Sequence, residues 1–382
     1  MKDEGSVYRS LIESFAPLDD PRIERKKLYP LMEIIFLSVC AVLSGFEDWE
    51  EIVDFGEEKL TWLRKYLPYK HGIPSHDTLN RVISLVDDRC FERCFIDWVD
   101  MSLVLPEGVV IHLDGKGLSR SATIKQQQTP HAMGGKGAVH ILHAWCSELQ
   151  VCLGQYKTET KSNEITAIPA LLDMLEVSGC LITIDAMGCQ KAIAEKIIAK
   201  DADYLFGVKD NQEVLSLAVF SAFKEAALTT DVDTQNDHNH GRKEVRNCRV
   251  LPASDLPEWG RIADWKGIET LIEIHSERHI LTTGVLEKET RYYISSLNGV
   301  AQEFNQLVRS HWNIENQLHW SLDVQFGEDD SRKRIRNAAQ NFSTIRKIVL
   351  NLLKANPEKI SIQRKRNKCA MSDSYREKML GF

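Results

Sequence analysis

The order of apolar segments between residues 106 and 208 constrains the fold of this chain more than any other feature. Three runs after Pro106 have the composition and alternation of strands: GVVIHLDGK, AVHILHAWC and QVCLGQYKT. A helical pattern, a strand, a second helix and a last strand follow as NEITAIPALLDMLEVSG, CLITIDAMG, QKAIAEKIIAK and DYLFGVKD. This succession predicts an α/β sheet flanked by helices.

The succession is typical of a ribonuclease-H-like mixed sheet, with three antiparallel strands followed by strands that alternate with helices. A chain of 382 residues is also long enough for more than one core. Helical patterns such as PLMEIIFLSVCAVLSG fill residues 1–105, which we assign to an N-terminal helical domain. That domain either packs as a bundle or contacts a DNA backbone. We assign residues 106–355 to the catalytic domain and residues 356–382 to a basic C-terminal tail.

Composition argues against several other classes of protein. The first residues, MKDEGSVYRS, lack the apolar segment of a secretory signal, and the apolar run Ile34–Leu43 is about half a membrane span. Nine cysteines occur without a CxxC pair, which favours reduced structural thiols over zinc ligands. We therefore expect a cytoplasmic protein that does not enter a membrane.

The positive charge is concentrated near the C-terminus. The chain as a whole has a net charge of -7, but residues 331–368 contain twelve lysines and arginines and one acidic residue, Glu358. Such a segment fits a surface that attracts a polyanion, and it fits equally well a solvated helix face followed by an irregular tail.

Two aspartates stand at the ends of apolar runs. Asp114 in IHLDGK shares a strand face with His112, and Asp185 in ITIDAM shares one with Thr183. Either aspartate could instead begin a turn, and this alternative is stronger for Asp114 because Asp-Gly is a hairpin signal. In the predicted sheet the two strands are neighbours, so we expect the two carboxylates to meet.

Glu315 in HWNIENQLHW falls inside the apolar stripe of a predicted helix, next to Leu318, when residues are placed at about 100° intervals. A buried, unpaired carboxylate would cost several kcal/mol or stay protonated. The side chain therefore either pairs with Arg309 or His311 in a core or binds a divalent cation. The GEDD segment at 327–330 reads instead as a solvated helix end or loop.

Three carboxylates without a thiolate partner favour Mg²⁺ or Mn²⁺ over zinc, and the histidines in HNHGR and HSERH lack a fourth zinc ligand at a suitable spacing. Two such ions can stabilise the attacking and leaving oxygens of an in-line phosphoryl displacement, with no covalent nucleophile on the protein. We expect Asp114, Asp185 and Glu315 to hold two ions in a site that cuts and joins DNA.

The stretch RSHWNIENQLHWSLDVQFGEDDSRKRIRNAAQNFSTIRKIVLNLL resembles the ISAs-type insertion-sequence transposases, which include the H-repeat-associated proteins. LDGKGLSRS, ITIDAMGCQ, FGVKDNQ and HGRKEVR extend the resemblance over most of the chain. It implies a DDE transposase, with Asp114, Asp185 and Glu315 as catalytic acids. It also implies a β-rich insertion at about 220–300, where VRNCRVLPA, IETLIEIHS, RHILTTG and TRYYISSL read as strands.

Basic side chains beside the acids are expected to hold DNA phosphates rather than to read sequence. The candidates are Lys116, Lys209, Arg242, Arg309, His311, Arg332 and Arg334. Related elements carry a Tyr, Arg, Glu, Lys signature around the third acid, whereas His311 and Leu322 stand four before and seven after Glu315 here. Trp312 and Trp320 either pack in the core or stack on an unpaired end base.

The resemblance implies a bacterial, nucleoid-associated enzyme that cleaves and transfers strands of double-stranded DNA at element ends, acting as a homodimer. Two alternatives remain open at this point. A structure-specific DNA endonuclease would use the same acids, and a catalytically inactive relic would bind element ends without cutting them.

Overall fold

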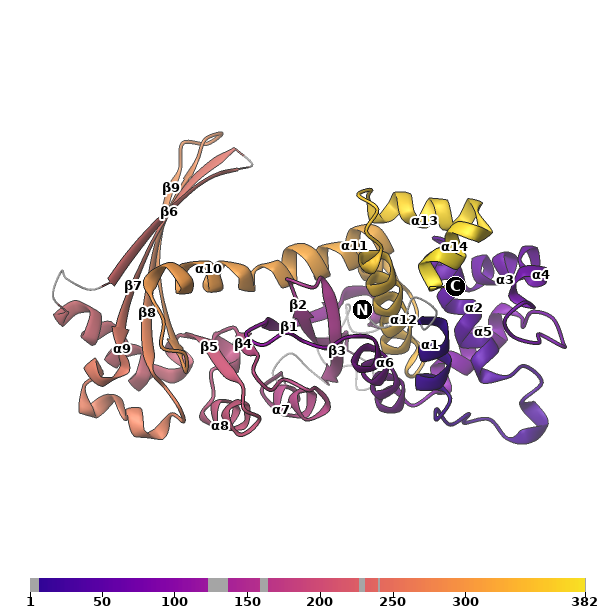
Figure 1. Cartoon of the computed structure of the whole chain (residues 1–382), viewed down its shortest axis with the longest axis horizontal. Coiled ribbons are helices and arrows are strands. Elements are labelled where there is room, and N and C mark those ends of the chain that lie inside the picture. Colours follow the sequence, from indigo (N-terminus) through magenta and orange to yellow (C-terminus); the bar gives the residue numbers. More distant parts are fainter. Residues whose placement is uncertain (1–6, 123–136, 159–163, 227–230, 240, 382) are drawn as a thin grey trace, which may run out of the picture.

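The computed structural model describes residues 7–122, 137–158, 164–226, 231–239 and 241–381. These residues form an elongated molecule, with helices from both ends of the chain on one side, a central sheet, and four long strands on the other side (Figure 1). None of the described helices combines the length and apolar character needed to cross a bilayer. All nine cysteines are free, and only Cys90 is exposed, as the sequence predicted.

Nine strands form one continuous sheet in the order β3-β2-β1-β4-β5-β9-β8-β7-β6. The strands are β1 (Val110–Leu118), β2 (Val139–Cys146), β3 (Val151–Thr158), β4 (Leu181–Ile184), β5 (Asp203–Val208), β6 (Asp231–Asn239), β7 (Arg242–Pro252), β8 (Thr270–Ile280) and β9 (Leu286–Ser295). The helices before the insertion are α1 (Val7–Phe15), α2 (Leu31–Leu43), α3 (Trp49–Glu58), α4 (Leu60–Leu63), α5 (His76–Leu85), α6 (Asp88–Ser102), α7 (Glu164–Met174), α8 (Lys191–Ala199) and α9 (Glu213–Glu225). Those after it are α10 (Ala301–His311), α11 (Trp320–Phe326), α12 (Ala338–Ala355), α13 (Ile362–Met371) and α14 (Asp373–Leu380).

The first five strands have the order and directions that bring the two predicted aspartates together. β1 and β2, and β2 and β3, are antiparallel, whereas β4 runs parallel to both β1 and β5. Leu113 of β1 is in register with Ile184 of β4. The next residue on each chain is an aspartate, so Asp114 and Asp185 leave neighbouring strands at the same level of the sheet.

Alternation along β1 and β4 divides the core into two layers, as a period of two predicts. Ile111 and Ile182 belong to the cluster that includes α7. Val110 and Leu181 belong to the opposite cluster, which includes Phe304 of α10. Figure 1 shows α7 and α8 below the sheet and α10 running above it toward α11. The aspartates share the α10 side, because they continue the even-numbered face of β1 and the odd-numbered face of β4.

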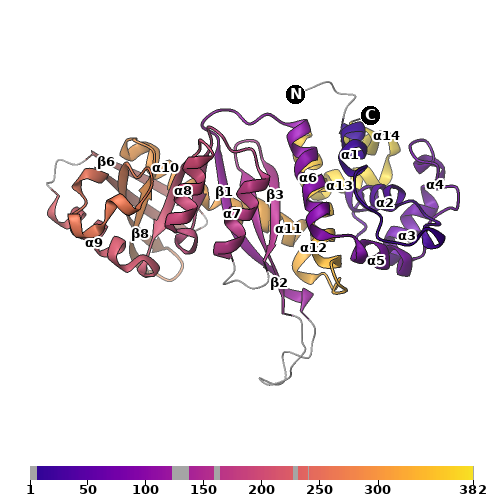
Figure 2. The ribbon, with the colours of Figure 1, turned by 90° about the horizontal axis from the view of Figure 1, so that it is seen from below.

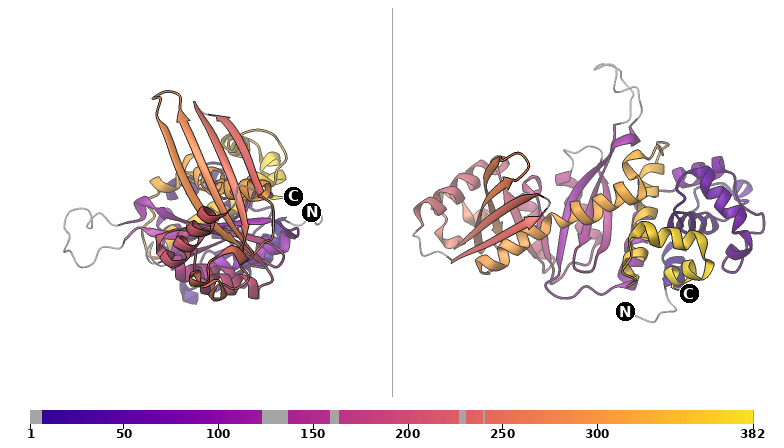
Figure 3. Two further views of the ribbon diagram at one scale, coloured as in Figure 1. Left: turned by 90° about the vertical axis from the view of Figure 1, so that its left-hand side faces the viewer. Right: turned by 90° about the horizontal axis from the view of Figure 1, so that it is seen from above.

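The β-rich insertion is a meander that extends the same sheet. β9 pairs with β5, and β8, β7 and β6 follow in antiparallel order. Figure 3 shows these four strands rising well beyond the body of the molecule. We did not predict β6, because DVDTQNDHN is almost wholly polar and the strand lies at the exposed edge of the sheet. The predicted strand RHILTTG is the end of β8 and the turn after it.

The C-terminal segment forms two packed helices, so our prediction of a basic tail over residues 356–382 was wrong. α12 is buried along almost its whole length and contacts α2, α5, α6 and β3, while α13 and α14 pack against α12 (Figure 2). Arg366 of α13 is 3% exposed and donates to the carbonyl oxygen of Val42 and to Glu47. The guanidinium of Arg366 therefore neutralises the carboxylate of Glu47 and caps the C-terminal end of α2 inside the protein.

The solvated-face interpretation of residues 331–368 was wrong for the same reason. Arg346, Lys347 and Lys365 are also buried, so much of the positive charge in this segment faces the interior. Sequence charge alone could not distinguish this arrangement from a DNA-binding surface.

Candidate active site

Asp114 lies within β1, which continues to Leu118, so the turn interpretation of Asp-Gly was wrong here. The residue is in register with His143 of β2, and its side chain is 21% exposed. His319 approaches it, with 3.7 Å between Nδ1 and a carboxylate oxygen of Asp114. Burial lowers the pKa of His319 to about 3, and this neutral ring interacts with His143 across 3.0 Å. No positive charge from these rings therefore neutralises Asp114 near pH 7.

Asp185 directly follows β4 and begins a 3-10 turn over Ala186–Gly188. Its Oδ1 accepts hydrogen bonds from the backbone N–H groups of Met187, at 3.0 Å, and Gly188, at 3.3 Å. The turn-starting role that the sequence suggested more strongly for Asp114 thus belongs to Asp185. Since both bonds use Oδ1, Oδ2 of this exposed side chain has no hydrogen-bond partner among the described residues and remains available to a ligand.

Glu315 is exposed, which overturns our prediction that it lies in a buried stripe. The segment Ile314–His319 is a π-helix, in which the wider turn shifts side chains away from the positions of a regular α-helix. Ile314 and Leu318 face the core, whereas Glu315 faces the pocket described next. The alternative pairing with Arg309 is absent as well, because Arg309 interacts with Asp237 and Glu244.

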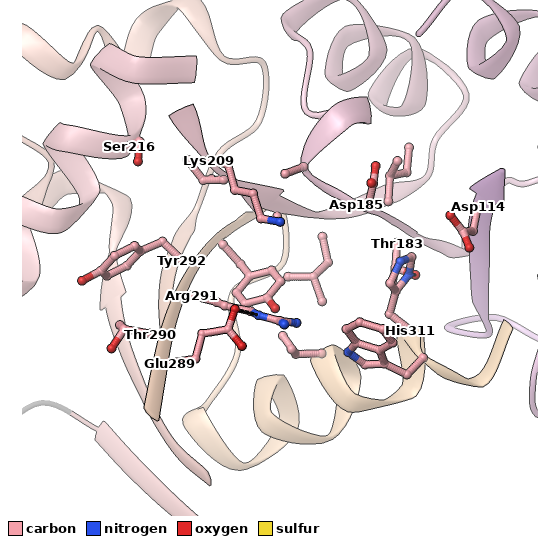
Figure 4. Close-up of a pocket in the computed structure, with 18 of the residues that line it drawn as sticks. Asp114, Thr183, Asp185, Lys209, Ser216, Glu289, Thr290, Arg291, Tyr292 and His311 are labelled. Carbon is pink, nitrogen blue, oxygen red and sulfur yellow. Dashed lines mark hydrogen bonds and ion pairs between the residues drawn. The ribbon is translucent and has the colours of Figure 1, made fainter. Parts of the chain in front are cut away.

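The three acids line one cavity of about 410 Å³ between the sheet and the C-terminal end of α10. Figure 4 shows Asp114, Thr183, Asp185 and His311 on one side of it and Lys209, Arg291 and Glu289 on the other. Among the residues that the structure describes, no three acidic, histidine or cysteine side chains are close enough to hold a single ion as they stand. The structure thus brings the acids into one pocket without placing them in a closed ligand cage.

Electrostatic crowding in the pocket is strongest at Asp114. Burial raises the pKa of its carboxyl to about 7, and the negative charges of Asp185, Glu315 and Glu164 add to the increase. Glu164 at the start of α7 is a carboxylate that sequence reasoning missed. It packs against Gly115 so closely that a Cβ at that position would lie 2.2 Å from Oε1, which explains the glycine without a turn.

In the absence of a divalent ion, we expect the free energy of unfolding to fall as the pH rises from 3.8 to about 7. The unfolded Asp114 ionises near its ordinary pKa of 3.8, whereas the folded side chain keeps its proton until about 7, so the folded state binds the extra proton in this interval. Asp114→Asn removes this titrating carboxyl, so the free energy of unfolding of the variant should depend less on pH. Urea unfolding in EDTA at about pH 5 and about pH 8 measures the change in the free energy of unfolding between the two pH values. An equal change in the wild type and in the variant would contradict the prediction.

Two basic residues line the far side of the pocket. Lys209 follows β5 and is exposed, as a phosphate contact requires. Arg291 of β9 was not predicted, because TRYYISSL was interpreted only as a strand. Its Nε donates to Glu289 at 2.7 Å, and its guanidinium lies 5.3 Å from the ring centre of Trp312. Trp312 is 41% exposed and Trp320 53%, so the core-packing interpretation of these rings was wrong.

Lys116 does not face the pocket as a free cation. It is 9% exposed and pairs with Asp323, Glu328 and Asp329. Our prediction of a phosphate contact at Lys116 was therefore wrong, because the ammonium group already has three carboxylate neighbours. The same contacts correct the prediction of a solvated GEDD segment at Glu328, which is 1% exposed, whereas the side chain of Asp330 is 76% exposed, as predicted.

The four predicted arginine contacts lie outside the residues that line the pocket. Arg309 is held by Asp237 and Glu244, and Arg334 donates from Nε to the carbonyl oxygen of Arg120 at 2.7 Å. Arg242 and Arg332 are exposed, and neither side chain contacts another described residue through a hydrogen bond or ion pair.

His311 does line the pocket, but it is not a cation near pH 7. Burial lowers its pKa to about 4, although the charge of Asp185 acts in the opposite direction. Its Nδ1 lies 2.8 Å from Oγ1 of Thr183. Leu322, at the other position that departs from the related signature, is fully buried. Neither residue supplies the positive charge that the signature would place near Glu315.

Comparison with known protein families agrees with this arrangement. Residues 12–99 match a family model described as "DDE_Tnp_1-associated", and residues 94–352 match one described as "Transposase DDE domain". The chain belongs to the DDE transposase family. The second model covers β1 to β9, α10, α11 and most of α12, and so it includes all three acids of the pocket.

Relatives of this DDE transposase include two Escherichia coli proteins of nearly the same length. "Putative transposase YncI" of strain O157:H7 is 42% identical over 97% of this chain and 94% of its own. "H repeat-associated putative transposase YhhI" of strain K12 is 40% identical over 96% of each chain. A solved piggyBac transposase synaptic complex with hairpin DNA is 12% identical, with a TM-score of 0.40 over 99% of this chain and 79% of that one.

Proposed function

We propose that the protein is the transposase of an insertion sequence and that it catalyses metal-dependent DNA strand cleavage and strand transfer. The observation that carries this proposal is the meeting of Asp114, Asp185 and Glu315 in one pocket. They come from two parallel strands and from the helix that follows the β insertion. The raised pKa of Asp114 favours a divalent cation as a ligand of these carboxylates, because the ion would relieve the repulsion among them.

The donor set fits Mg²⁺ or Mn²⁺, since the pocket offers carboxylate oxygens and no thiolate. Asp114, Asp185 and Glu315 would hold the ions, two in number by analogy with other phosphoryl-transfer sites. When bound there, such ions would supply activation of the attacking oxygen and stabilisation of the leaving oxygen at the DNA phosphate. The exposed Oδ2 of Asp185 and the exposed carboxylate of Glu315 are accessible for this role.

The order of β1 to β5 supports a ribonuclease-H-like catalytic domain in which the strands β6 to β9 are an insertion. Residues 1–105 would form a separate N-terminal helical domain. We propose double-stranded DNA as the partner, at element ends and at the target, bound by a homodimer in the bacterial cytoplasm. Lys209 and Arg291 would contact phosphates at the far side of the pocket, and the exposed ring of Trp312 would stack on an unpaired end base.

Incubation of the purified protein with Mg²⁺ and DNA that carries the inverted repeats flanking its gene is expected to give nicks at the repeat ends and joined products with a target plasmid. Denaturing gels and sequencing of the junctions measure both steps. Nicks without joining of a pre-cleaved 3′-hydroxyl end would identify a structure-specific endonuclease. Retarded but uncut DNA, with Mg²⁺ and with Mn²⁺, would identify an inactive DNA-binding relic.

A further inference from the structure

Two hydrogen bonds link the strands and the helix from which the three acids extend. Oγ1 of Thr183 lies 2.7 Å from Nδ1 of His112 and 2.8 Å from Nδ1 of His311. His112 and Thr183 are at most 1% exposed. The rings of His112 and His311 meet edge to face, with 5.8 Å between their centres. Together, the two hydrogen bonds and the ring contact join β1, β4 and the last residue of α10.

The three residues joined in this way come from the same elements as the three acids. His112 stands two residues before Asp114 on β1, and Thr183 stands two residues before Asp185 at the end of β4. Each pair shares one face of its strand, because side chains alternate. His311 ends α10, just before the π-helix that carries Glu315. A shift in any of these contacts would therefore move one acid relative to the other two.

The hydroxyl of Thr183 can serve both rings at once only if they play opposite roles. A hydroxyl has one proton, so it donates to one Nδ1 and accepts from the other. The separations of 2.7 Å and 2.8 Å from the two Nδ1 atoms fit one donated and one accepted hydrogen bond at the same hydroxyl. A valine has nearly the same shape as threonine but would break both hydrogen bonds.

We propose that Thr183, bridging His112 and His311, is a positioning residue that fixes the mutual placement of Asp114, Asp185 and Glu315 for binding divalent ions. This inference rests on the proposed function of the acids. Groups that support metal ligands orient those ligands, and their loss commonly weakens metal binding by about 10–100-fold. Here the support is indirect, because the two hydrogen bonds fix the strands and the helix end that precede the acids. Thr183 itself does not need to touch an ion or the DNA.

The test compares Thr183→Val with Thr183→Ser, which keeps the hydroxyl, and with Thr270→Val as a matched control. Thr270 on β8 is a buried threonine whose Oγ1 donates to the carbonyl oxygen of Leu297 at 2.6 Å, and it does not line the pocket. Mn²⁺ binding is measured by electron paramagnetic resonance, alongside DNA cleavage as a function of Mg²⁺ and the KM for DNA. Thermal unfolding monitors the fold of each variant.

We expect Thr183→Val to weaken Mn²⁺ binding at least about tenfold and to raise the Mg²⁺ concentration needed for cleavage by a similar factor. The KM for DNA should not change, and Thr183→Ser should restore Mn²⁺ binding to within about threefold. Thr270→Val should lose stability without losing Mn²⁺ affinity. If Thr183→Val does not fold, His311→Leu and His311→Asn replace the pair, because the asparagine amide can take the place of Nδ1.

Wild-type Mn²⁺ affinity in Thr183→Val, or an equal loss in Thr270→Val, would overturn the inference. Failure of Thr183→Ser to restore binding would do the same. If the Asp114→Asn variant binds Mn²⁺ as tightly as the wild type does, the proposed role of the acids is overturned, and the inference with it. The Asp114→Asn control therefore separates failure of the positioning role from failure of the proposed function.

Discussion

Asp114→Asn is expected to reduce DNA cleavage at saturating Mg²⁺ by at least about 10³-fold, which corresponds to roughly 4 kcal/mol of transition-state stabilisation. Asparagine keeps the size of the side chain but cannot supply the negative oxygen that a divalent ion needs. It also removes a carboxyl whose pKa burial and Asp185 raise to about 7, so the fold should not suffer. Asp185→Asn and Glu315→Gln should cause losses of the same order. Gel-based cleavage and strand-transfer assays measure the effect.

Asp210→Asn is the matched control for these substitutions. Asp210 is exposed and lines the same pocket, but it is not among the charges that raise the pKa of Asp114. Its replacement changes the charge of the pocket equally, and cleavage should stay within about threefold of wild type, a difference of less than 1 kcal/mol. Undiminished cleavage in Asp114→Asn, or an equal loss in Asp210→Asn, would show that the three acids do not act as we propose.

Glu328→Ala is expected to lower the free energy of unfolding by about 3–5 kcal/mol, because it would leave buried cations without their carboxylate. Glu328 lies 3.1 Å from the ammonium group of Lys116 and 3.8 Å from that of Lys347, and it accepts a hydrogen bond from Ser343 at 2.7 Å. Lys347 is fully buried. These contacts keep the pKa of Glu328 down to about 2 against the opposing effect of burial. Urea unfolding near pH 7 measures the loss.

A control for this prediction lies in the same turn. Asp330 pairs with Arg120 at 3.2 Å, and its side chain is 76% exposed. Asp330→Ala should cost about 0–1 kcal/mol, as exposed ion pairs do. If Glu328→Ala were no more destabilising than Asp330→Ala, the network around Lys116 would be of little consequence for the fold. Because Lys116 stands two residues after Asp114, Glu328→Ala should also weaken cleavage.

The sequence predicted the part of the site that depends on strand periodicity. Alternation on β1 and β4 put Asp114 and Asp185 on one face, and the observed register of Leu113 with Ile184 brings their ends together. The predicted antiparallel pairing of β1, β2 and β3 and the predicted neighbouring positions of β1 and β4 are confirmed. Local sequence patterns were enough to place these two aspartates, because a side chain on a strand can face only one side of the sheet or the other.

The errors come from features that local patterns do not encode. A regular 100° spacing placed Glu315 in a core, but one π-helical segment changes which side chains face inward. Lys116 was predicted to contact a DNA phosphate and Glu328 to be solvated, but the two side chains pair with each other across 212 positions of sequence, which makes their burial tolerable. Arg366 misled us in the same way, because its acceptors are Val42 and Glu47 near the other end of the chain.

The packing of α13 on α2 affects how the molecule can assemble during synthesis. Arg366 and Val42, which form one of its hydrogen bonds, are 324 positions apart in the sequence. The helix α2 leaves the ribosome well before α12 and α13, so it exposes apolar surface until those two helices have been synthesised. We expect α2 to need protection by chaperones until the catalytic sheet and α13 have been translated, so that helices far apart in the sequence acquire their native packing together.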